Sequence, residues 1–365
     1  MRNNSVRWLP AKLAAIGLGR AVRQAVMVSM LGAAGTVLAD PVVMHVATAG
    51  PPGHVQNSIV FPTWAKWIED ATEGRVTVKL EYGLGSQSTF FNLVEDGIAD
   101  VAWAYHGYVP GRFQLTQIVE LPNLGVNAEA ASQAYWEVYE KYLAKAGEHE
   151  GVQLLGLFTH GPGQIHSTHE IRSMADLAGM KVRIGGGIQQ VLGERMHVTP
   201  VGAPGPKVYE MMQQGIVDGV FMPAASQKDF RLAEVAPWLT LLPGGLYLGS
   251  FAMFANEDFM DSLEPRDRKA ILAVSGAKLS ALAGKAWDQS DLKGIEMAEQ
   301  YKVHINRLQA DSPMVAEFQQ LTKGIDQQWL AIAKEKGVDG QAALTELRQR
   351  AHELMAQEGQ VAANP

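Results

Sequence analysis

The sequence predicts an α/β protein with two lobes. Strand and helix patterns alternate along the chain. Residues 181–185 and 216–221 have strand patterns, and residues 206–214 have a helix pattern that begins at a proline and ends before Gly215. The chain has 365 residues, of which 47% are hydrophobic, and this is enough for two lobes with a core each.

The other elements follow from hydrophobic periodicity and from Gly and Pro at the breaks. Strands are expected at residues 42–47, 75–82, 100–105, 152–158, 196–201, 238–242, 246–254 and 303–308. Helices are expected at residues 56–72, 88–95, 128–146, 226–235, 264–301, 312–337 and 339–358, and a loop at residues 159–170. The pattern at 264–301 is interrupted only weakly by glycines, so it predicts one long helix.

Residues 1–39 have the composition of a secretory signal peptide. They contain five Lys and Arg residues and no acid, followed by an apolar run at residues 25–38 and small residues up to Ala39. We therefore expect cleavage after Ala39 and export to the periplasm. A membrane anchor is the less favoured alternative, because Ser29, Gly32 and Gly35 interrupt a run that is shorter than a bilayer span.

Charge and cysteine content exclude several classes of function. Loss of the five cations of residues 1–39 changes the formal net charge from -7 to -12. Such an acidic surface repels nucleic acid, so no nucleic-acid partner is expected. The chain has no cysteine, which excludes disulfides, thiolate metal sites, cysteine nucleophiles and a lipid-modified cysteine. The residues also contain no nucleophile elbow, Walker loop or complete dinucleotide fingerprint.

A specific motif set lies between Asp176 and Gly219. The segments Asp176-Leu177, Gly179–Arg183, Val208–Glu210, Gln213–Gly215 and Val217–Gly219 occur in this order. Together they resemble the signature of the TRAP transporter solute-binding proteins, the DctP family. The likeness extends into the N-terminal half, through the strand at residues 42–47 with its Pro/Gly turn and the segments Gly74-Arg-Val, Leu84-Gly85 and Gly97-Ile-Ala-Asp-Val.

The resemblance implies a particular fold. It is the two-lobe periplasmic-binding-protein (Venus flytrap) fold, with a long helix that crosses both lobes. On that basis we assign residues 40–158 and 250–310 to lobe I and residues 159–249 to lobe II. Residues 311–365 are expected to form C-terminal helices packed across the lobes.

Arg183 is the main candidate for ligand binding. Lys181 and Arg183 share one face of their strand, while Val182 and Ile184 occupy the other. A guanidinium at a strand end offers parallel donors that match a carboxylate, which a lysine cannot reproduce. The resemblance implies that Arg183 grips the carboxylate of an organic acid. A solvated strand-end arginine is the alternative reading.

Further candidates come from both lobes. Gln87 and Tyr105 are expected to close over the ligand from lobe I, and Tyr108 lies in a loop just past a strand end. Tyr105 and its neighbour Trp103 have an alternative role as strand core residues. In lobe II, Met222 stands where several branches of the family have an amide, with Phe221 beside it, and Gln164 lies in the expected loop at residues 159–170.

The same loop departs from the family. Relatives often carry a second arginine where residues 168–171 stand here, and the sequence leaves open whether His169 takes its place. A metal held by His166 and His169 is the alternative. It is disfavoured because the nearby Gly and Pro argue against the helix that their spacing would need.

These features together predict a binding protein. An apolar Met222 and a missing second cation favour a monocarboxylate with an apolar or aromatic body over a sugar acid or a dicarboxylate. The resemblance implies delivery to TRAP membrane subunits that use an ion gradient, and we expect a monomer without a cofactor. The alternatives are a sensory protein that presents the same acid to a receptor kinase and, less favoured, a periplasmic enzyme.

Overall fold

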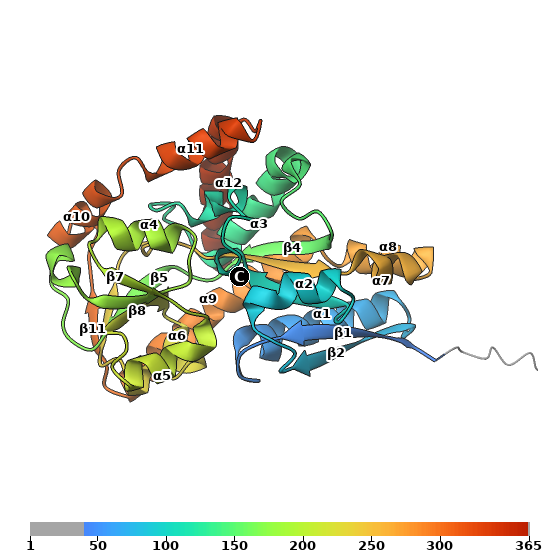
Figure 1. The fold of residues 1–365 in the computed structure, drawn as a ribbon, viewed down its shortest axis with the longest axis horizontal. Helices are drawn as coiled ribbons and strands as arrows, with labels where there is room; N and C mark the ends of the chain where they lie inside the picture. The colour runs from blue at the N-terminus through green and yellow to red at the C-terminus, as the bar shows by residue number, and fades with distance from the viewer. Residues whose placement is uncertain (1–39, 364–365) are drawn as a thin grey trace, which may run out of the picture. The chain divides into compact units, whose positions relative to one another are not determined.

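The computed structural model describes residues 40–363, and from Pro41 onward the chain forms one unit. The signal peptide expected at residues 1–39 lies outside the described residues. Two mixed sheets organise the unit, one in each lobe. In Figure 1, β1, β2 and β4 lie on one side, β7, β8 and β11 on the other, and α9 between them.

The first sheet has five strands in the order β2-β1-β3-β10-β4. β1 is parallel to β2 and β3, whereas β10 is antiparallel to β3 and β4. β3 and β10 are buried along their whole length, which fits their nearly continuous apolar sequences. The bounds are β1 (Val42–Thr48), β2 (Val76–Tyr82), β3 (Val101–Tyr105), β4 (Gln153–Thr159) and β10 (Ser250–Ala255).

The second sheet has six strands in the order β11-β9-β5-β8-β6-β7. β6 is parallel to β7 and β8, and β5 is antiparallel to β8 and β9. The bounds are β5 (Gly163–Ser167), β6 (Lys181–Ile184), β7 (Thr199–Gly202), β8 (Gly219–Pro223), β9 (Trp238–Leu241) and β11 (His304–Arg307).

Two sequence predictions are corrected by this sheet. Residues 159–170 were expected to be a loop, but residues 163–167 form β5 in the middle of the sheet. The glycines and the proline in and next to this segment favoured the prediction of a loop. Residues 250–310 were assigned to lobe I, but β11 pairs with β9 in the second sheet. The chain therefore returns to lobe II after α9.

Helices surround both sheets. α1 shows how the sequence forms them, because Pro62 occupies its first turn and Phe61, Trp64 and Ile68 recur on one buried face. The helices of the N-terminal half are α1 (Phe61–Ala71), α2 (Phe90–Glu95), α3 (Ala128–Val138) and α4 (Ile188–Arg195). The others before the C-terminal group are α5 (Val208–Gln213), α6 (Ser226–Asp229), α7 (Glu257–Ser262), α8 (Pro265–Ala273) and α9 (Ala277–Gln300). The sequence did not predict α4.

The predicted helix at residues 264–301 is two helices. α8 ends at Ala273, and α9 begins after Gly276, whose φ of 59° suits glycine because a side chain would be strained there. The remaining 24-residue α9 contacts elements of both lobes, including α3 and β4 on one side and α6 on the other. A long helix that crosses both lobes is therefore present.

Two carboxylates fasten α9 to a helix start in each lobe. Asp288 accepts hydrogen bonds of 2.8 Å from the backbone N–H groups of Ala128 and Glu129, at the start of α3. Asp291 accepts one of 2.7 Å from the N–H of Ala225, at the start of α6. Each carboxylate satisfies backbone donors that a helix start leaves without an internal partner.

The C-terminal helices contact different lobes. In α10 (Pro313–Leu321), Glu317 accepts a hydrogen bond of 3.0 Å from the N–H of Met174 in lobe II. Trp329 of α11 (Ile325–Glu335) donates its indole N–H to the carbonyl of Leu115 in lobe I at 3.1 Å. α12 (Gly340–Ala363) pairs Arg350 with Glu137 of α3. These helices therefore reach both lobes.

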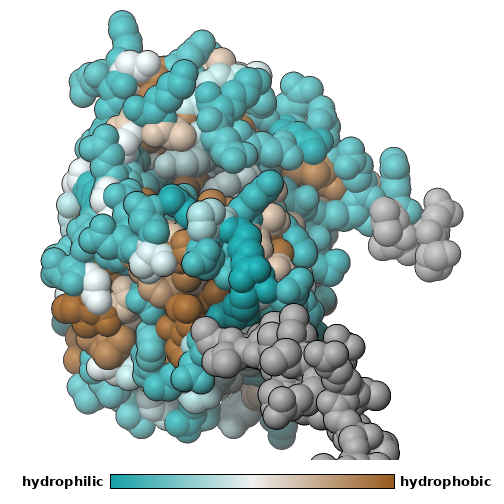
Figure 2. All heavy atoms as spheres, turned by 90° about the vertical axis from the view of Figure 1, so that its right-hand side faces the viewer, coloured by the Kyte–Doolittle hydropathy of each residue, from teal (hydrophilic) through white to brown (hydrophobic). Residues whose placement is uncertain are grey.

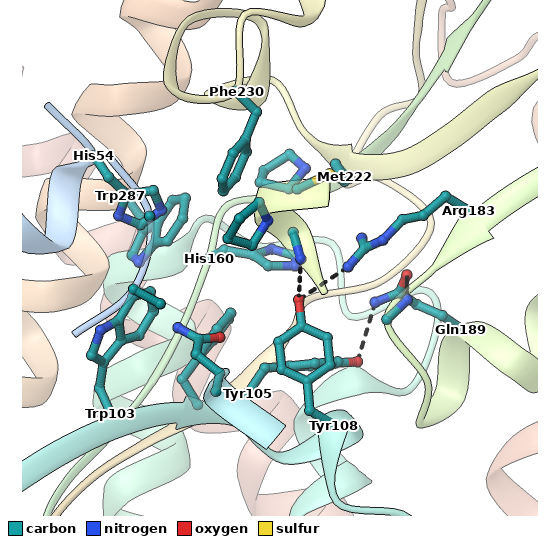
Figure 3. A pocket seen from close by; sticks show the side chains of 18 of the residues that line it. His54, Trp103, Tyr105, Tyr108, His160, Arg183, Gln189, Met222, Phe230 and Trp287 are labelled. Atoms are coloured by element: carbon teal, nitrogen blue, oxygen red, sulfur yellow. Dashed lines mark hydrogen bonds between the residues drawn. The ribbon is translucent and has the colours of Figure 1, made fainter. Parts of the chain in front are cut away.

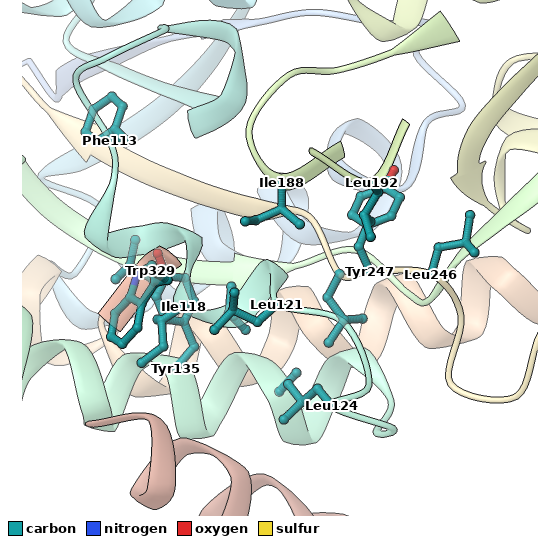
Figure 4. Close-up of a cluster of buried hydrophobic side chains, with 14 of the residues drawn as sticks. Phe113, Ile118, Leu121, Leu124, Tyr135, Ile188, Leu192, Leu246, Tyr247 and Trp329 are labelled. Atoms are coloured by element: carbon teal, nitrogen blue, oxygen red, sulfur yellow. The ribbon is translucent and has the colours of Figure 1, made fainter. Parts of the chain in front are cut away.

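The apolar core continues from one lobe into the other. Ile118 and Leu121 of lobe I belong to the same cluster of buried side chains as Ile188 and Leu192 of α4, and Figure 4 shows these four residues together. Burial of each such side chain stabilises the fold by roughly 1.5–3 kcal/mol. Contact between the lobes at this point therefore contributes to stability as well as to the geometry of the site.

The surface drawn in Figure 2 is largely hydrophilic, with smaller hydrophobic patches between the polar side chains. Within residues 40–363, no helix combines the length and the apolar character needed to cross a membrane.

Candidate functional site

A cavity lies between the two lobes, with about 540 Å³ of space that atoms do not fill. Lobe I contributes the loops after β1, β2 and β3, and lobe II contributes β6, β8 and the segments that follow them. Figure 3 shows Arg183 on one side of the cavity and His54, Trp103 and Trp287 on the other.

Arg183 is a buried cation near the end of β6, where it pairs in register with Val201 of β7 and Val220 of β8. Its side chain is 2% exposed. Its Nε donates to the carbonyl of Ala203 at 2.8 Å, and Nη2 donates to the hydroxyl of Tyr108 at 3.0 Å. Both partners are neutral. Among residues 40–363, no carboxylate lies within ion-pair distance of this guanidinium, so it keeps donors for an anion in the cavity.

Tyr108 holds the arginine from the opposite lobe. It ends the short helical turn at residues 106–108 that directly follows β3. Its hydroxyl accepts hydrogen bonds from Arg183 and, at 2.9 Å, from the backbone N–H of Gly205. Its ring stands edge-on to Tyr105, with 5.0 Å between the ring centroids. Tyr108, just after β3 in lobe I, therefore holds both the guanidinium of Arg183 and the backbone N–H of Gly205 in lobe II.

Tyr105 makes a second set of contacts between the lobes. Its hydroxyl donates to the carbonyl of Gly186 and accepts from the amide of Gln189, both at 3.2 Å. The other end of the Gln189 amide accepts from the N–H of Gly185 at 3.0 Å. These bonds hold the start of α4 beside β3, and they leave the polar groups of Tyr105 and Gln189 with partners in the protein.

Glu120 is a buried carboxylate behind this contact. It is 1% exposed and accepts backbone hydrogen bonds from Ile188 of lobe II at 3.1 Å and Ser250 of lobe I at 3.0 Å. Burial raises the pKa of Glu120 to about 7, although the two backbone N–H donors oppose this shift. The carboxyl group thus ties the two lobes together next to the cavity.

Aromatic rings form most of the cavity wall away from Arg183. The ring of Phe251 lies parallel to that of Phe158 behind it, with 5.5 Å between the centroids. Trp103 and Trp287 flank Phe251 at 5.6 Å and 6.2 Å. Phe230 of lobe II joins this wall, with its ring centroid 5.6 Å from that of His54 (Figure 3). Flat apolar surfaces of this kind favour a flat apolar ligand body.

Two buried histidines also line the cavity. Burial lowers the pKa of both His54 and His160 to about 4, so both imidazoles are neutral at pH 7. His160 stands edge-on to Tyr247, with 5.2 Å between the centroids, and its Nδ1 contacts the carbonyl of Gly161. The positive charge in the cavity therefore comes from Arg183 and not from these rings.

Five of the eight residues predicted from the sequence line this cavity: Gln87, Tyr105, Tyr108, Arg183 and Met222. Tyr105 also belongs to a buried strand, so the two roles weighed for it are compatible. Trp103 shares its strand face because it lies two residues away.

The other three predicted residues lie outside the cavity lining. Phe221 is fully buried on the opposite face of β8 from Met222. Gln164 uses its amide oxygen to accept a hydrogen bond of 2.8 Å from Leu242. His169 is exposed just after β5. His166, weighed as a metal ligand, instead bonds to the carbonyl of Met222 at 3.0 Å and to Gln227 at 2.7 Å.

Sequence reasoning missed several lining residues. His54 had been read as part of a turn, and Trp287 lies on α9 far along the chain. His160 and Tyr247 come from the segments that connect the sheets after β4 and after β9, and Phe251 lies in β10. The Pro/Gly turn after the first strand was a usable signal for His54, since loops at the carboxyl ends of parallel strands carry ligand contacts.

Comparisons with known proteins agree with this architecture. A sequence model of the family described as bacterial extracellular solute-binding protein, family 7 (DctP), matches residues 46–330. The curated relative named outer membrane transporter protein TsaT, from Comamonas testosteroni, is 32% identical over 305 residues, which cover 82% of this chain and 89% of the relative.

Two solved structures are also similar. A TRAP periplasmic solute-binding protein from Bordetella bronchiseptica, with bound (R)-mandelate and (S)-mandelate, is 37% identical with a TM-score of 0.83, covering 86% of this chain and 100% of that one. A TRAP solute-binding protein from Rhodoferax ferrireducens, in complex with copurified benzoate, is 26% identical with a TM-score of 0.81, covering 88% and 99%. The chain therefore belongs to the DctP family of TRAP transporter periplasmic solute-binding proteins.

Proposed function

We propose that this protein is the extracytoplasmic receptor of a TRAP transporter and binds an aromatic monocarboxylate between its lobes. The observation that carries the proposal is Arg183, a cation that is 2% exposed and has only neutral partners, Ala203 and Tyr108. A buried charge without a counter-charge is costly, and a ligand carboxylate offsets that cost. Charge-assisted hydrogen bonds to the free donors contribute about 1.5–3 kcal/mol each.

The wall of the cavity supports an aromatic body for the ligand. Trp103, Phe230, Phe251 and Trp287 present apolar ring surfaces, and Met222 is apolar as well. Each hydroxyl of a sugar acid placed against these surfaces would lose its water without gaining a partner, at a cost of about 1–3 kcal/mol. The similar proteins with bound mandelate and benzoate carry aromatic monocarboxylates.

The contacts between the lobes support binding by closure. Tyr108 meets Arg183 and Gly205 across the cavity, and Tyr105 meets Gly186 and Gln189. A carboxylate bound at Arg183 lies beside these bridges, so it favours the conformation in which they form. The closed form then delivers the acid to TRAP membrane subunits for uptake driven by an ion gradient. The composition of residues 1–39 supports export to the periplasm through a cleaved signal peptide.

The proposal is tested by titration calorimetry with benzoate, mandelate and the neutral analogue benzamide. We expect the acids to bind and benzamide to bind at least tenfold more weakly, because only the carboxylate compensates Arg183. In Arg183→Lys the dissociation constant should rise about tenfold, since the forked geometry is lost while the charge stays. In Arg183→Ala it should rise about 100-fold, because the charge is lost as well.

A matched control is Arg172→Ala, which removes an exposed arginine of lobe II that pairs with Glu170. This variant should bind as the wild type does. Equal affinity for benzoate and benzamide, or an Arg183→Ala variant that binds as tightly as Arg172→Ala, would overturn the proposal. A sugar acid or dicarboxylate that binds more tightly than every aromatic acid would overturn the assigned ligand class.

A further inference from the structure

We propose that the cavity also recognises a hydroxyl group on the far end of the aromatic acid, through His54 and Gln87. The inference rests on the proposed function, because it takes the carboxylate at Arg183 as the other end of the ligand. It narrows the ligand class to hydroxylated aromatic monocarboxylates.

His54 offers a hydrogen-bond donor at this end. Its Nδ1 accepts a hydrogen bond of 3.2 Å from the backbone N–H of Gln56, so the ring hydrogen is on Nε2. The side chain is 2% exposed and lines the cavity. Within the part of the chain that the structure describes, no acceptor contacts Nε2. A buried donor without a partner is costly, and a ligand acceptor removes that cost.

The surroundings of His54 define its orientation. Its ring is edge-on to Trp287, with 5.2 Å between the centroids, and lies 5.5 Å from Trp103 and 5.6 Å from Phe230. In Figure 3 these rings are on the side of the cavity away from the Arg183 guanidinium. The donor is therefore held by rigid neighbours at a fixed position, which is what discrimination between ligands requires.

Gln87 offers both a donor and an acceptor. It begins the short helical turn at residues 87–89, is 7% exposed and lines the same cavity. Its amide has no hydrogen-bond partner among residues 40–363. β1 and β2 are parallel and end in register, with Thr48 paired with Tyr82, so the loops that carry His54 and Gln87 leave the same edge of the sheet.

Several other polar side chains of the cavity are already engaged. The hydroxyl of Tyr247 donates to the carbonyl of Phe221 at 3.0 Å, and the indole N–H of Trp103 donates to the hydroxyl of Thr48 at 2.9 Å. Tyr105 and Gln189 bond to each other and to the backbone near Gly186. Within residues 40–363, Nε2 of His54 and the amide of Gln87 have no protein partner, and neither has the indole N–H of Trp287 in the same cavity wall.

A ligand hydroxyl satisfies both groups at once. Its oxygen accepts from Nε2 of His54, and its hydrogen is donated to the amide oxygen of Gln87. A second carboxylate fits less well, because both groups are neutral and the nearby Lys228 is already paired with Asp229 at 3.4 Å. His54 and Gln87 therefore favour a ligand with a hydroxyl group at this position over a ligand with a hydrogen atom or a second carboxylate there.

The test compares ligands on the wild-type protein first. Dissociation constants are measured by calorimetry for benzoate and phenylacetate and for their 3- and 4-hydroxy and 3- and 4-fluoro derivatives. We expect at least one hydroxy acid to bind tenfold or more tightly than both its parent and its fluoro analogue, because fluorine is small but cannot donate. This comparison needs no variant and so does not depend on whether a variant folds.

The second arm measures the same ratio of hydroxy to fluoro affinity in His54→Phe and Gln87→Leu. In each variant the hydroxy and fluoro acids should bind with affinities that differ by less than about threefold. Gln190→Leu, on the exposed face of α4, should keep the wild-type ratio. Hydroxy, fluoro and parent acids that bind the wild type equally, or a ratio that persists in both variants, would overturn the inference and leave the proposed function intact. Failure of every aromatic acid to bind would instead overturn the proposed function itself.

Discussion

At the scale of single residues, the sequence predicted which cation lies in the cavity but not which residue holds it. Arg183 was identified from strand alternation and from its motif, and it lies in the cavity. The role of Tyr108 as its partner was not predictable, because Tyr108 is carried by the other sheet. A sequence pattern reports the face of one strand, whereas this contact depends on how two lobes meet.

Tyr108→Phe should weaken ligand binding without unfolding the protein. The change removes the hydroxyl that accepts from Arg183 and from Gly205, and it keeps the ring that packs on Tyr105. Two hydrogen bonds with a neutral acceptor contribute about 1–3 kcal/mol together, and only part of this is lost from binding because Arg183 can still pair with the ligand. We therefore expect the dissociation constant for benzoate to rise about three- to thirtyfold by calorimetry.

The control for this change is Tyr82→Phe, since Tyr82 is 46% exposed at the end of β2. This variant also loses a tyrosine hydroxyl, but one that lies outside the cavity. It should bind benzoate as the wild type does. If Tyr108→Phe and Tyr82→Phe have the same affinity, the Tyr108 hydroxyl does not position Arg183.

At the scale of elements, most strands and helices were predicted to within a few residues, including β1, β2, β3 and β4. The errors share a cause, which is that tertiary contacts override local pattern. β5 directly follows Gly161 and Pro162 and begins at Gly163, yet it lies between β8 and β9 and is buried throughout. α4 has a weak apolar pattern, and its N-terminus is held by Glu120. Neither partner is visible in the local sequence.

α9 provides a prediction at this scale. In Gly294→Ala the new Cβ would lie 2.1 Å from the carbonyl oxygen of Ala224, so the helix or the lobe II segment before α6 must move. Overpacking of this kind costs about 1–3 kcal/mol, which outweighs the gain of up to about 1 kcal/mol from placing Ala instead of Gly in a helix. We expect a lower free energy of unfolding in urea titrations.

The matched control is the same substitution in another helix. Gly359 lies in α12, and a Cβ there would meet no atom within 4 Å. Gly359→Ala should therefore leave stability unchanged or raise it by up to about 1 kcal/mol. Equal effects of the two substitutions would show that α9 does not pack closely on lobe II at Gly294.

At the scale of the whole molecule, the site depends on how often the chain passes between the sheets. Along the described strands it changes sheet after β4, after β9 and after β10. The cavity is lined from both sheets and from these connections, so residues far apart in sequence converge there. For this reason the sequence could indicate the family and the arginine in the cavity, but it could not identify the aromatic wall or His54.

Buried histidines give the molecule a dependence on pH. Burial lowers the pKa of five of them from 6.5, to about 4 for His54, His160 and His166, to about 3 for His149 and well below the ordinary value for His106. Their folded pKa is depressed, so between about pH 4 and 6.5 the unfolded chain binds protons that the folded chain does not. Each such group contributes stability that is present at pH 7 and is lost as the pH falls.

Three buried carboxylates act in the opposite direction. Burial raises the pKa of Glu120 to about 7, that of Asp288 to about 6 and that of Asp291 well above its ordinary value. Their folded pKa is raised, so their contribution is present at low pH and is lost as the pH rises through the folded pKa. Five histidines outweigh three carboxylates. The free energy of unfolding should therefore fall as the pH is lowered from 6.5 to 5, by on the order of 2 kcal/mol per pH unit.

Urea titrations at half-unit steps from pH 5 to 7.5 measure how the free energy of unfolding changes with pH. The variant Glu120→Gln tests which groups cause this change. The amide cannot ionise, so one opposing group disappears and the slope between pH 5 and 6.5 should become steeper by about 1 kcal/mol per pH unit. Glu296→Gln, which changes an exposed residue of α9, should keep the wild-type slope. Stability that rises on acidification in the wild type would contradict the dominance of the histidines. If the pH dependence of the unfolding free energy is unchanged in Glu120→Gln, Glu120 is ionised in the folded protein throughout this range. The group that bonds to both lobes is then a buried carboxylate that carries no proton.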